Sequence, residues 1–216
     1  RGHAVQPLRS IMWLPGIAGA LGMMPAYSAD KRIMGIKVIS VFSGNSQFGY
    51  SSHQGVVLLF ESTHGQLLSI VDADEITAIR TAAVSGLATR VLARDVVSTL
   101  AILGSGRQAR QHIDAMLCVR QMNAIRIWSR NYWNAEALAV HASRKHNIPA
   151  IAVKDARDAV SNADIICTTT ASPTPVMLHE WIQRGAHINA VGSFTPDTRE
   201  CDTPAIVNAK LYTDRY

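Results

Sequence analysis

Apolar segments alternate with short polar turns in the first part of the chain, which is the pattern of an antiparallel sheet. Residues 32–42 (RIMGIKVISVF) and 55–62 (GVVLLFES) are rich in β-branched and apolar side chains and are expected to be strands. A Gly-containing turn separates the second of them from 66–73 (QLLSIVDA), so these two segments are expected to form a hairpin. The apolar run 11–24 is interrupted by proline and glycine and is too short to span a bilayer, so strand and turn are expected there.

A helix is expected to follow, from Asp74 to about residue 93. Asp74 can act as its N-cap, because a carboxylate there accepts hydrogen bonds from the free N–H groups of the first turn. Apolar residues recur at helical spacing and predict one inward face, made of Ile76, Ala83, Leu87 and Val91.

Two basic residues stand where the surrounding pattern is apolar. Arg80 falls on the inward face of the expected helix, and Lys37 lies in a strand that is apolar on both faces. A buried cation needs a partner, since removing its charge from water is costly. Each side chain could reach solvent or pair with a carboxylate, or it could form part of an anion clamp in a cleft. The pattern leaves both interpretations open.

From residue 98 the pattern changes to alternating strands and helices. The expected strands are 98–104, 124–130, 149–153, 163–170 and 186–192, with 211–214 (LYTD) as a sixth. The expected helices are 107–119, 134–146 and 155–163, with a helical turn at 176–182. Strand–helix–strand repetition predicts a parallel sheet with helices on both faces, and hence the α/β class.

The first strand of this part runs into a glycine-rich turn, ILGSGRQA, at Ile102–Ala109. Gly104 suits the tight turn, Gly106 would let a pyrophosphate approach the backbone, and Ala109 would pack the helix against the strand. Gln108 would join these three at the helix N-terminus, where free N–H groups bind phosphates. The order of strand, turn and helix favours dinucleotide binding, and the alternative is an ordinary strand–helix turn of a flavodoxin-like domain.

Cofactor specificity is expected at the end of the second strand of this part. NAD-binding domains place a carboxylate there for the ribose 2′-hydroxyl, whereas this chain has Ser129 and Arg130. Arg130 could hold a 2′-phosphate through charge-assisted hydrogen bonds, with help from Arg107. NADP(H) is therefore favoured and NAD(H) is possible. The alternative is that Arg130 is only a solvent-exposed side chain.

The ends of the fourth and fifth strands of this part, 163–170 and 186–192, are expected at the carboxyl edge of the sheet, where parallel α/β sheets bind their ligands. Small and hydroxyl-bearing residues stand there. The alternative is that they only begin ordinary loops without binding a ligand. The residues expected to line the nicotinamide side are Thr168, Thr169, Val191, Gly192 and Ser193.

Composition and charge exclude several other classes. Hydrophobic residues make up 48% and charged residues 17%, which is typical of a globular chain. The net charge is +5, but the basic residues are scattered, so no nucleic-acid or membrane partner is expected. Cys118, Cys167 and Cys201 are far apart, which suggests reduced thiols in a cytoplasmic protein, with the first two in the core. The histidines show no ligand spacing, and no metal site is expected.

Several segments together resemble the ornithine cyclodeaminase/mu-crystallin family, in matching order and spacing from about Arg9 to Asp214. They are MPAY (24–27), GIKVIS (35–40), HQGVVLLF (53–60), EITAIRTAAVSGLAT (75–89), ILGSGRQA (102–109) and GAHINAVGSFTPDTRE (185–200).

The resemblance implies a Rossmann-type doubly wound parallel sheet plus a smaller α+β domain for substrate binding and dimerisation. The substrate-binding domain would occupy residues 1–93, with a linking helix at about 74–93, and the dinucleotide-binding domain residues 94–216. Family members extend further at both ends, so both the outer first half and the C-terminal return segment are expected to be missing here. A homodimer and a small amino- or imino-acid substrate are also implied.

The resemblance also assigns roles to single residues. The family's clamp for the substrate carboxylate falls on Arg9, Lys37 and Arg80, of which the last two would be catalytic. Thr81 would join the residues that bind the cofactor. Phe194 stands where cyclodeaminases carry a catalytic Asp, two residues after the Gly of the VG motif.

Without that carboxylate, the resemblance favours an imine reductase. Such an enzyme would transfer hydride from NADPH to the C=N bond of a small α-imino acid, cyclic imino acids included. The proton on the imine nitrogen could come from Lys37 or arrive with the substrate. The alternatives are an ornithine cyclodeaminase, an alanine or opine-type amino-acid dehydrogenase, and a non-catalytic NADPH-binding protein.

Overall fold

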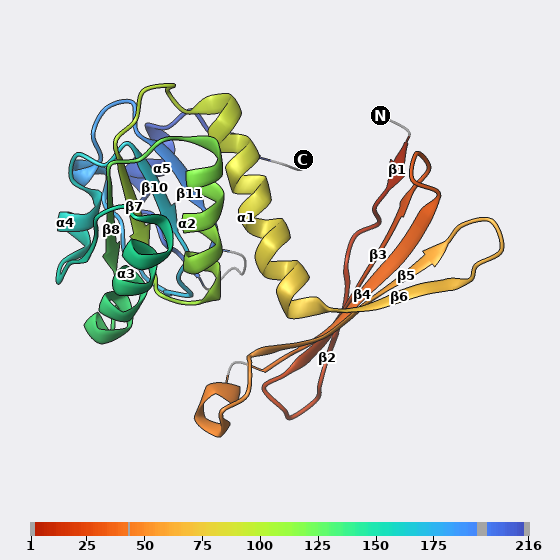
Figure 1. Cartoon of the computed structure of the whole chain (residues 1–216). Coiled ribbons are helices and arrows are strands. Elements are labelled where there is room, and N and C mark those ends of the chain that lie inside the picture. The colour runs from red at the N-terminus through yellow and green to blue at the C-terminus, as the bar shows by residue number, and fades with distance from the viewer. Residues whose placement is uncertain (1–2, 43, 194–197, 214–216) are drawn as a thin grey trace. The chain divides into compact units, whose positions relative to one another are not determined.

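The computed structural model describes residues 3–42, 44–193 and 198–213 of the chain (Figure 1). The chain forms two compact units, of which one ends at Ile79 and the other begins at Arg80. The division falls within one long helix, α1 (Ala73–Leu92), which contributes to both units. The sequence places the whole helix with the first domain, and these domain limits stay a prediction.

The first unit contains an antiparallel sheet of six strands (Figure 1). Strands β3, β4, β5 and β6 lie side by side in chain order, and both β1 and β2 pair with β3. A short 3-10 helix, η1, lies between β4 and β5. The bounds are β1 (Ala4–Val5), β2 (Ser10–Trp13), β3 (Ala20–Ser28), β4 (Ile33–Val41), η1 (Asn45–Phe48), β5 (His53–Glu61) and β6 (Leu67–Asp72).

The expected strands of this half are therefore confirmed, including the hairpin of β5 and β6. One carboxylate organises its turn: Glu61 accepts hydrogen bonds from the backbone N–H groups of Thr63, His64 and Gln66, at 2.6, 2.6 and 3.0 Å. These bonds, led by that from Gln66, lower the pKa of Glu61. The turn is thus held by local hydrogen bonds that the sequence pattern alone does not show.

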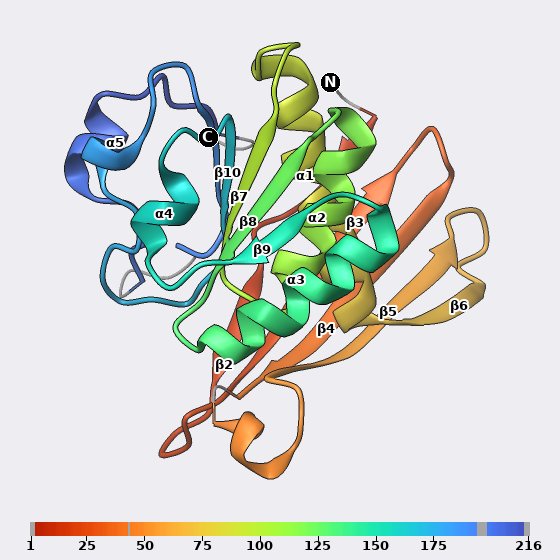
Figure 2. The ribbon, with the colours of Figure 1, turned by 60° about the vertical axis from the view of Figure 1, so that its left-hand side comes forward.

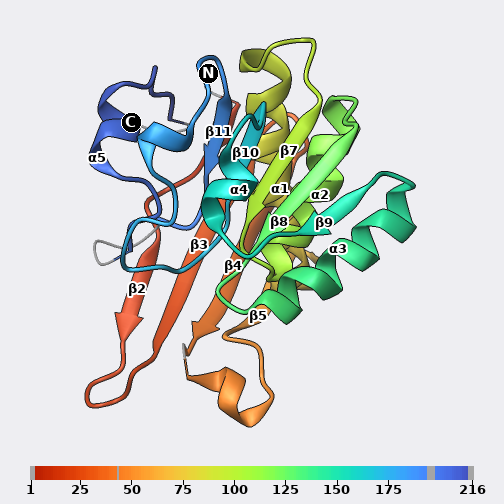
Figure 3. The same ribbon diagram turned by 90° about the vertical axis from the view of Figure 1, so that its left-hand side faces the viewer.

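The second unit is built on a five-stranded parallel sheet in the order β11-β10-β7-β8-β9 (Figure 3). Its elements are β7 (Thr99–Leu103), α2 (Arg107–Val119), β8 (Ala124–Trp128), α3 (Tyr132–His146), β9 (Ala150–Ala152), α4 (Ala156–Val160), β10 (Ile165–Thr168), η2 (His179–Trp181), β11 (His187–Ala190) and α5 (Thr203–Val207). The expected alternation of strands and helices is confirmed.

Helices α2 and α3 lie on one face of this sheet and α4 and α5 on the other (Figure 2). A hydrophobic core fills each of the two sides. Leu100 and Ile102 of β7 pack with α2 and α3, whereas Ala101 and Leu103 of the same strand pack with α4 and α5. Successive side chains of a strand point to opposite faces, so a strand that is covered on both sides is apolar throughout. This arrangement is the doubly wound α/β fold that the sequence predicts.

The start of α1 differs from the expectation in its cap. The helix begins at Ala73, and the carboxylate of Asp72 accepts a hydrogen bond of 2.8 Å from the backbone N–H of Glu75. Asp74 already lies inside the helix, where its carboxylate accepts a hydrogen bond from the Ser51 hydroxyl at 3.4 Å. The predicted N-cap, Asp74, was therefore wrong by two residues. Positions 72 and 74 both carry an aspartate, and the sequence alone does not show which of the two precedes the helix.

The packing face of α1 is the second difference. Within the second unit its buried residues are small or polar: Ala82, Ser85, Gly86 and Thr89. The expected inward residues Ala83, Leu87 and Val91 are instead exposed, the last two by 53% and 69%. Small side chains allow helices to approach closely, and here hydrogen bonds add to the contact. The prediction of an inward apolar face was wrong for this part of the helix.

Those hydrogen bonds join α1 to α2 and to the sheet. Ser85 bonds the Nε2 of His112 at 2.9 Å, and the Asn189 amide of β11 donates to the Thr89 hydroxyl at 3.0 Å. At the far end of α1, the Arg120 guanidinium donates to the carbonyl groups of Arg90, Ala93 and Arg94. A cation on the terminal carbonyl groups complements the negative end of a helix dipole.

Two further expectations were wrong. Residues 211–213 of the expected sixth strand are not a strand; Leu211 and Tyr212 are 71% and 53% exposed and are not paired with the sheet. Cys118 is exposed, because it lies away from the face of α2 that packs on the sheet, whereas Cys167 is buried as expected. Burial raises the pKa of the Cys167 thiol to about 12.

Candidate functional site

The turn between β7 and α2 has the backbone that the glycine-rich motif predicts. Gly104 has φ of 122°, and a Cβ there would lie 2.6 Å from the Thr169 hydroxyl, so both conformation and space require glycine. Gly106 is the N-cap of α2 and makes no side-chain cap hydrogen bond. A Cβ on Gly106 would meet no atom within 4 Å. An open backbone at an uncapped helix N-terminus is suited to binding an anion.

The rest of the loop also follows the motif. Ala109 is fully buried and belongs to the core between α2 and the sheet. Arg107 is exposed at the first position of α2, and Gln108 is half-buried beside it. The loop therefore presents a positive side chain and free backbone surface on its outer side, and apolar packing on its inner side.

The end of β8 lies beside this loop. The hydroxyl groups of Ser129 and Ser105 are hydrogen-bonded at 2.8 Å, which joins the strand end to the glycine-rich turn. Arg130 follows and is exposed, and Asn131 caps α3 by accepting a hydrogen bond of 3.0 Å from the backbone N–H of Trp133. A serine and an arginine thus occupy the place where NAD-binding domains have a carboxylate.

The strand order reverses beside β7: the chain continues from β7 to β8 on one side, and returns to β10 on the other. In open α/β sheets the ligand crevice lies outside the carboxyl ends of the strands at such a point. Thr168 ends β10 and is fully buried, and Thr169 follows it, with its hydroxyl donating to the Leu103 carbonyl at 3.1 Å. Two of the residues predicted for this edge, Thr168 and Thr169, thus lie beside the end of β7.

The end of β11 comes close to that of β10. Val191 donates a backbone hydrogen bond of 3.0 Å to the Thr168 carbonyl. A Cβ on Gly192 would lie 1.8 Å from the Thr170 carbonyl oxygen and 2.6 Å from the Glu200 carboxyl, so only glycine fits. Ser193 follows, and its hydroxyl accepts a hydrogen bond of 3.1 Å from the backbone N–H of Glu200.

Glu200 is a residue of this edge that the sequence analysis missed. It is fully buried, although it stands in a polar stretch. Nothing in the local pattern separates it from exposed carboxylates, and only the motif GAHINAVGSFTPDTRE, which it ends, could have drawn attention to it. Phe194, at the position of the cyclodeaminase Asp, lies outside the described residues.

The first unit contains a second group of polar side chains, at the N-terminal end of α1. The Lys37 ammonium donates a hydrogen bond of 3.0 Å to the Thr77 hydroxyl. His53, at the start of β5, is half-buried nearby. Burial is the main cause of its lowered pKa; the charge of Asp74 opposes this shift and that of Lys37 adds to it. Lys37 is therefore engaged by polar groups, and neither His53 nor Thr77 was predicted for this group.

The other two expected members of the carboxylate clamp are exposed. Arg80 lies on α1, three residues after Thr77, and Thr81 follows it. Residues three apart in a helix lie on the same side of it. Arg9 precedes β2 in an exposed segment of the first unit.

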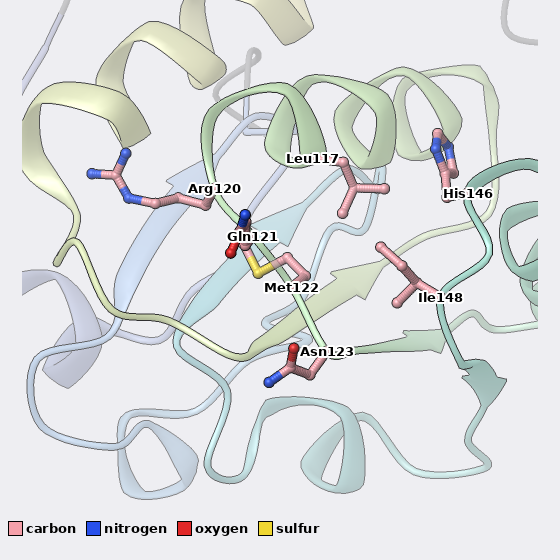
Figure 4. A pocket seen from close by; sticks show the side chains of 7 residues that line it. All are labelled: Leu117, Arg120, Gln121, Met122, Asn123, His146 and Ile148. Atoms are coloured by element: carbon pink, nitrogen blue, oxygen red, sulfur yellow. The ribbon is translucent and has the colours of Figure 1, made fainter.

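A hollow on the second unit lies elsewhere (Figure 4). It is lined by residues between the end of α2 and the start of β8, and by the end of α3, so it lies at the amino ends of the strands. Arg120 there holds the end of α1, and His146 bonds the Asp114 carboxylate at 2.8 Å. Its polar groups thus serve the packing of helices, away from the edge described above.

The described part of the chain, residues 3–42, 44–193 and 198–213, shows neither a metal site nor a membrane-spanning helix. No group of three or more His, Cys, Asp or Glu side chains there could hold a metal ion. In the same ranges, no helix has both the length and the hydrophobicity that crossing a bilayer requires.

Comparisons with known proteins agree with the family resemblance. The model of the ornithine cyclodeaminase/mu-crystallin family matches residues 2–216. The ketimine reductase mu-crystallin of Mus musculus is 38% identical over 213 residues, which are 99% of this chain and 67% of the mouse protein.

Two solved structures are similar along most of the chain. The Δ1-pyrroline-2-carboxylate reductase of Thermococcus litoralis, in complex with NADH and L-proline, matches with a TM-score of 0.92 and 34% identity, covering 97% of this chain and 65% of that one. An archaeal alanine dehydrogenase dimer with bound NAD matches with a TM-score of 0.90 and 28% identity, covering 97% and 63%.

The chain therefore spans about two thirds of the length of these relatives. The similar structures confirm the Rossmann-type α/β fold class. From the match of the family's model along the chain, and from the mouse relative, we conclude that this chain belongs to the ornithine cyclodeaminase/mu-crystallin family.

Proposed function

We propose that the whole protein reduces the C=N bond of a small α-imino acid, cyclic imino acids included, with a nicotinamide dinucleotide. The observation that carries this proposal is the turn from β7 to α2, which combines an open glycine with an uncapped helix N-terminus beside the reversal of strand order. The reaction class is supported by two relatives, which reduce ketimines or pyrroline-2-carboxylate according to their names.

The cofactor, when bound, supplies the hydride. In our proposal the backbone at Gly104, Gly106, Gln108 and Ala109 holds its pyrophosphate. The fit of this loop to a phosphate group is supported by the empty space at Gly106 and the missing cap of α2. Thr168, Thr169, Val191, Gly192 and Ser193 would border the nicotinamide, and Thr81 would add a contact from α1.

We propose NADP(H) as the preferred cofactor, with NAD(H) as the alternative. Arg130 would pair with the 2′-phosphate, Ser129 would bond it, and Arg107 would assist. Support comes from the exposed position of Arg130 after β8 and from the Ser105–Ser129 bond that orients this edge. The two related structures hold NADH and NAD, which supports the alternative.

Lys37 and Arg80 would bind the substrate carboxylate, with Arg9 as a third cation. Two positive groups would favour an anionic imino acid and fix its C=N bond for hydride transfer. Lys37 could also supply the proton to the imine nitrogen, unless the substrate arrives protonated. The hydrogen bond from Lys37 to the helix that carries Arg80 supports the first of these roles.

For the whole protein we propose substrate binding and dimerisation by residues 1–93 and cofactor binding by residues 94–216. A homodimer is supported by the related alanine dehydrogenase, which is described as a dimer. A cytoplasmic location is supported by the free cysteines Cys118, Cys167 and Cys201.

The test is a substrate panel. The whole protein is mixed with NADPH or NADH and with cyclic imino acids, pyruvate plus amines, or ornithine, and the absorbance of the reduced cofactor is followed. Consumption with an imino acid is expected. Consumption only with pyruvate and amines or ammonia would favour an amino-acid dehydrogenase, the second candidate, which the related alanine dehydrogenase supports.

Two other results would overturn the proposal. Proline and ammonia formed from ornithine would indicate a cyclodeaminase. Cofactor binding without consumption of cofactor by any imine would indicate a binding protein without catalytic turnover.

A further inference from the structure

Glu200 is a fully buried carboxylate at the carboxyl edge of the parallel sheet. One of its oxygens accepts hydrogen bonds from the Thr170 backbone N–H at 2.5 Å and from the Thr170 hydroxyl at 2.7 Å. The other accepts from the Thr168 hydroxyl at 2.7 Å and from the Gly192 backbone N–H at 2.6 Å. Four donors compensate the loss of water around this side chain.

These bonds connect two loops that are distant in sequence. Thr170 belongs to the loop after β10, and Gly192 to the loop after β11. Gly192 has no side chain, and this leaves room for the Glu200 carboxyl and the Thr170 carbonyl to lie close to its Cα. The backbone of Glu200 adds to the same connection, because its N–H donates to the Ser193 hydroxyl at 3.1 Å.

The donor set requires a carboxylate rather than any polar side chain. The four donors are neutral, and each carboxylate oxygen faces one backbone N–H, which cannot reverse its direction. A glutamine side chain has one accepting oxygen and one donating amino group. In either orientation its amino group would face the N–H of Thr170 or of Gly192, and one loop would lose its anchor.

We infer that Glu200 is a positioning residue, which sets the loops after β10 and β11 at the separation that hydride transfer requires. This inference rests on the proposed function, in which both loops border the nicotinamide. Small errors in the placement of reacting groups lower a rate strongly even where binding is retained. The pyrophosphate and adenosine ends of the cofactor are held by other loops, so cofactor affinity is expected to depend little on Glu200.

A purely stabilising role is the alternative, and the same sheet offers a matched control. Asp164 precedes β10 at the amino edge and also accepts four hydrogen bonds, from Ser98, Thr99, Arg94 and Gln183. Like Glu200 it carries one negative charge and accepts four hydrogen bonds, one of them here from the Arg94 guanidinium, but it lies at the opposite end of β10 from the proposed cofactor loops. Loss of this carboxylate should affect stability alone.

The experiment compares Glu200→Gln with Asp164→Asn in the whole protein. NADPH-binding sites are counted by fluorescence titration, and kcat for an imino acid is expressed per binding site. We expect Glu200→Gln to lower kcat per site on the order of 100-fold with nearly unchanged NADPH affinity. Asp164→Asn is expected to lower the melting temperature and leave kcat per site unchanged. Equal kcat per site in both variants would overturn the inference.

A second pair of variants keeps the test decisive if Glu200→Gln does not fold. Thr170→Val removes one hydroxyl donor but keeps the backbone N–H, whereas Thr170→Ser keeps both. The valine variant is expected to lower kcat per site and the serine variant to restore it. Wild-type turnover in the valine variant would contradict the inference.

Hydrogen exchange separates this inference from the proposed function. If the wild-type protein consumes no cofactor with any imine, the proposed function fails, and the amides of Thr170 and Gly192 still report on Glu200. In Glu200→Gln at least one of these amides should exchange faster on the order of tenfold, as expected for loss of one hydrogen bond. Asp164→Asn should leave both slow, and unchanged exchange of both in Glu200→Gln would refute the connection itself.

Discussion

The ammonium nitrogen of Lys37, on strand β4, donates a hydrogen bond of 3.0 Å to the hydroxyl oxygen of Thr77, near the beginning of α1. The Thr77 hydroxyl in turn donates to the Ala73 carbonyl at 2.6 Å. The direction of both bonds is thereby set, and the cation is directed toward the helix that carries Arg80.

Replacement of Lys37 by methionine is the first prediction. A charge-assisted hydrogen bond to a carboxylate contributes about 1.5–3 kcal/mol, so KM for the imino acid should rise about 10- to 100-fold. KM is measured at saturating NADPH. Lys31→Met, at an exposed lysine between β3 and β4, is the control and should leave KM unchanged. An unaltered KM in Lys37→Met would remove Lys37 from the clamp.

The second prediction concerns Arg130 and the choice of cofactor. Arg130→Ala should weaken NADPH binding about tenfold or more, through loss of a charge-assisted contact to the 2′-phosphate, and leave NADH binding unchanged. Dissociation constants for both cofactors are measured by fluorescence. Arg144→Ala, at an exposed position of α3, serves as the control. If the ratio of the two constants does not change, the assignment of Arg130 is wrong.

Two glycines of one loop should respond differently to the same change. Gly104→Ala is expected to lower the melting temperature, because its φ of 122° is unfavourable for alanine and the new methyl group would meet Thr169. Gly106 has a φ of −82°, which alanine readily adopts, and a Cβ there would meet no other atom, so Gly106→Ala should retain the fold. Its methyl group would occupy the place proposed for the pyrophosphate, and NADPH affinity should fall strongly.

Thermal unfolding and cofactor titration of both variants test this pair. A Gly106→Ala protein that is folded and still binds NADPH normally would exclude this loop as the cofactor site. A Gly104→Ala protein with wild-type stability would contradict the close approach to Thr169.

The buried His112 leads to a pH prediction. Burial lowers its pKa below the ordinary value of 6.5, and its Nδ1 bonds the Gln108 carbonyl at 2.8 Å while Nε2 faces the Ser85 hydroxyl. With a lower pKa in the folded state, the unfolded chain binds more protons below about pH 6.5. The free energy of unfolding should therefore decrease as the pH falls from 7.5 to 5.5.

Urea unfolding at both pH values measures this effect. Burial also lowers the pKa of His53 and His187, so the relevant quantity is the difference between the wild type and His112→Gln. The variant should be less stable at pH 7.5 and lose less stability on acidification. His141→Gln, at an exposed position of α3, is the control, and equal pH dependence in wild type and His112→Gln would contradict the prediction.

Features that depend on neighbouring residues were predicted from the sequence with good success. The doubly wound sheet follows from apolar strands at regular intervals, and the glycine-rich turn follows from the backbone that Gly104 alone can adopt there. The hairpin of β5 and β6 is equally local. In each of these cases, residues a few positions apart determine the conformation.

Features that depend on distant residues were missed or predicted wrongly. The apolar stripe of α1 through Leu87 was expected to face inward, but Ser85 and Thr89 on another side of the helix meet hydrogen-bonding partners on α2 and β11. The role of Glu200 depends on four donors that the chain brings together only after β10 and β11 pair.

By itself, then, the sequence determined the order and type of most elements as far as β11, the glycine-rich turn and the family, because these are encoded in short-range spacing and in motif order. The tertiary structure decided which face of α1 is buried, that Lys37 bonds Thr77, and that Glu200 is a buried connector rather than a surface carboxylate. The physical reason is that burial and hydrogen bonding of a polar side chain depend on groups supplied by other strands and helices. Their approach is set by the packing of the sheet and its helices, and not by the residues adjacent in sequence.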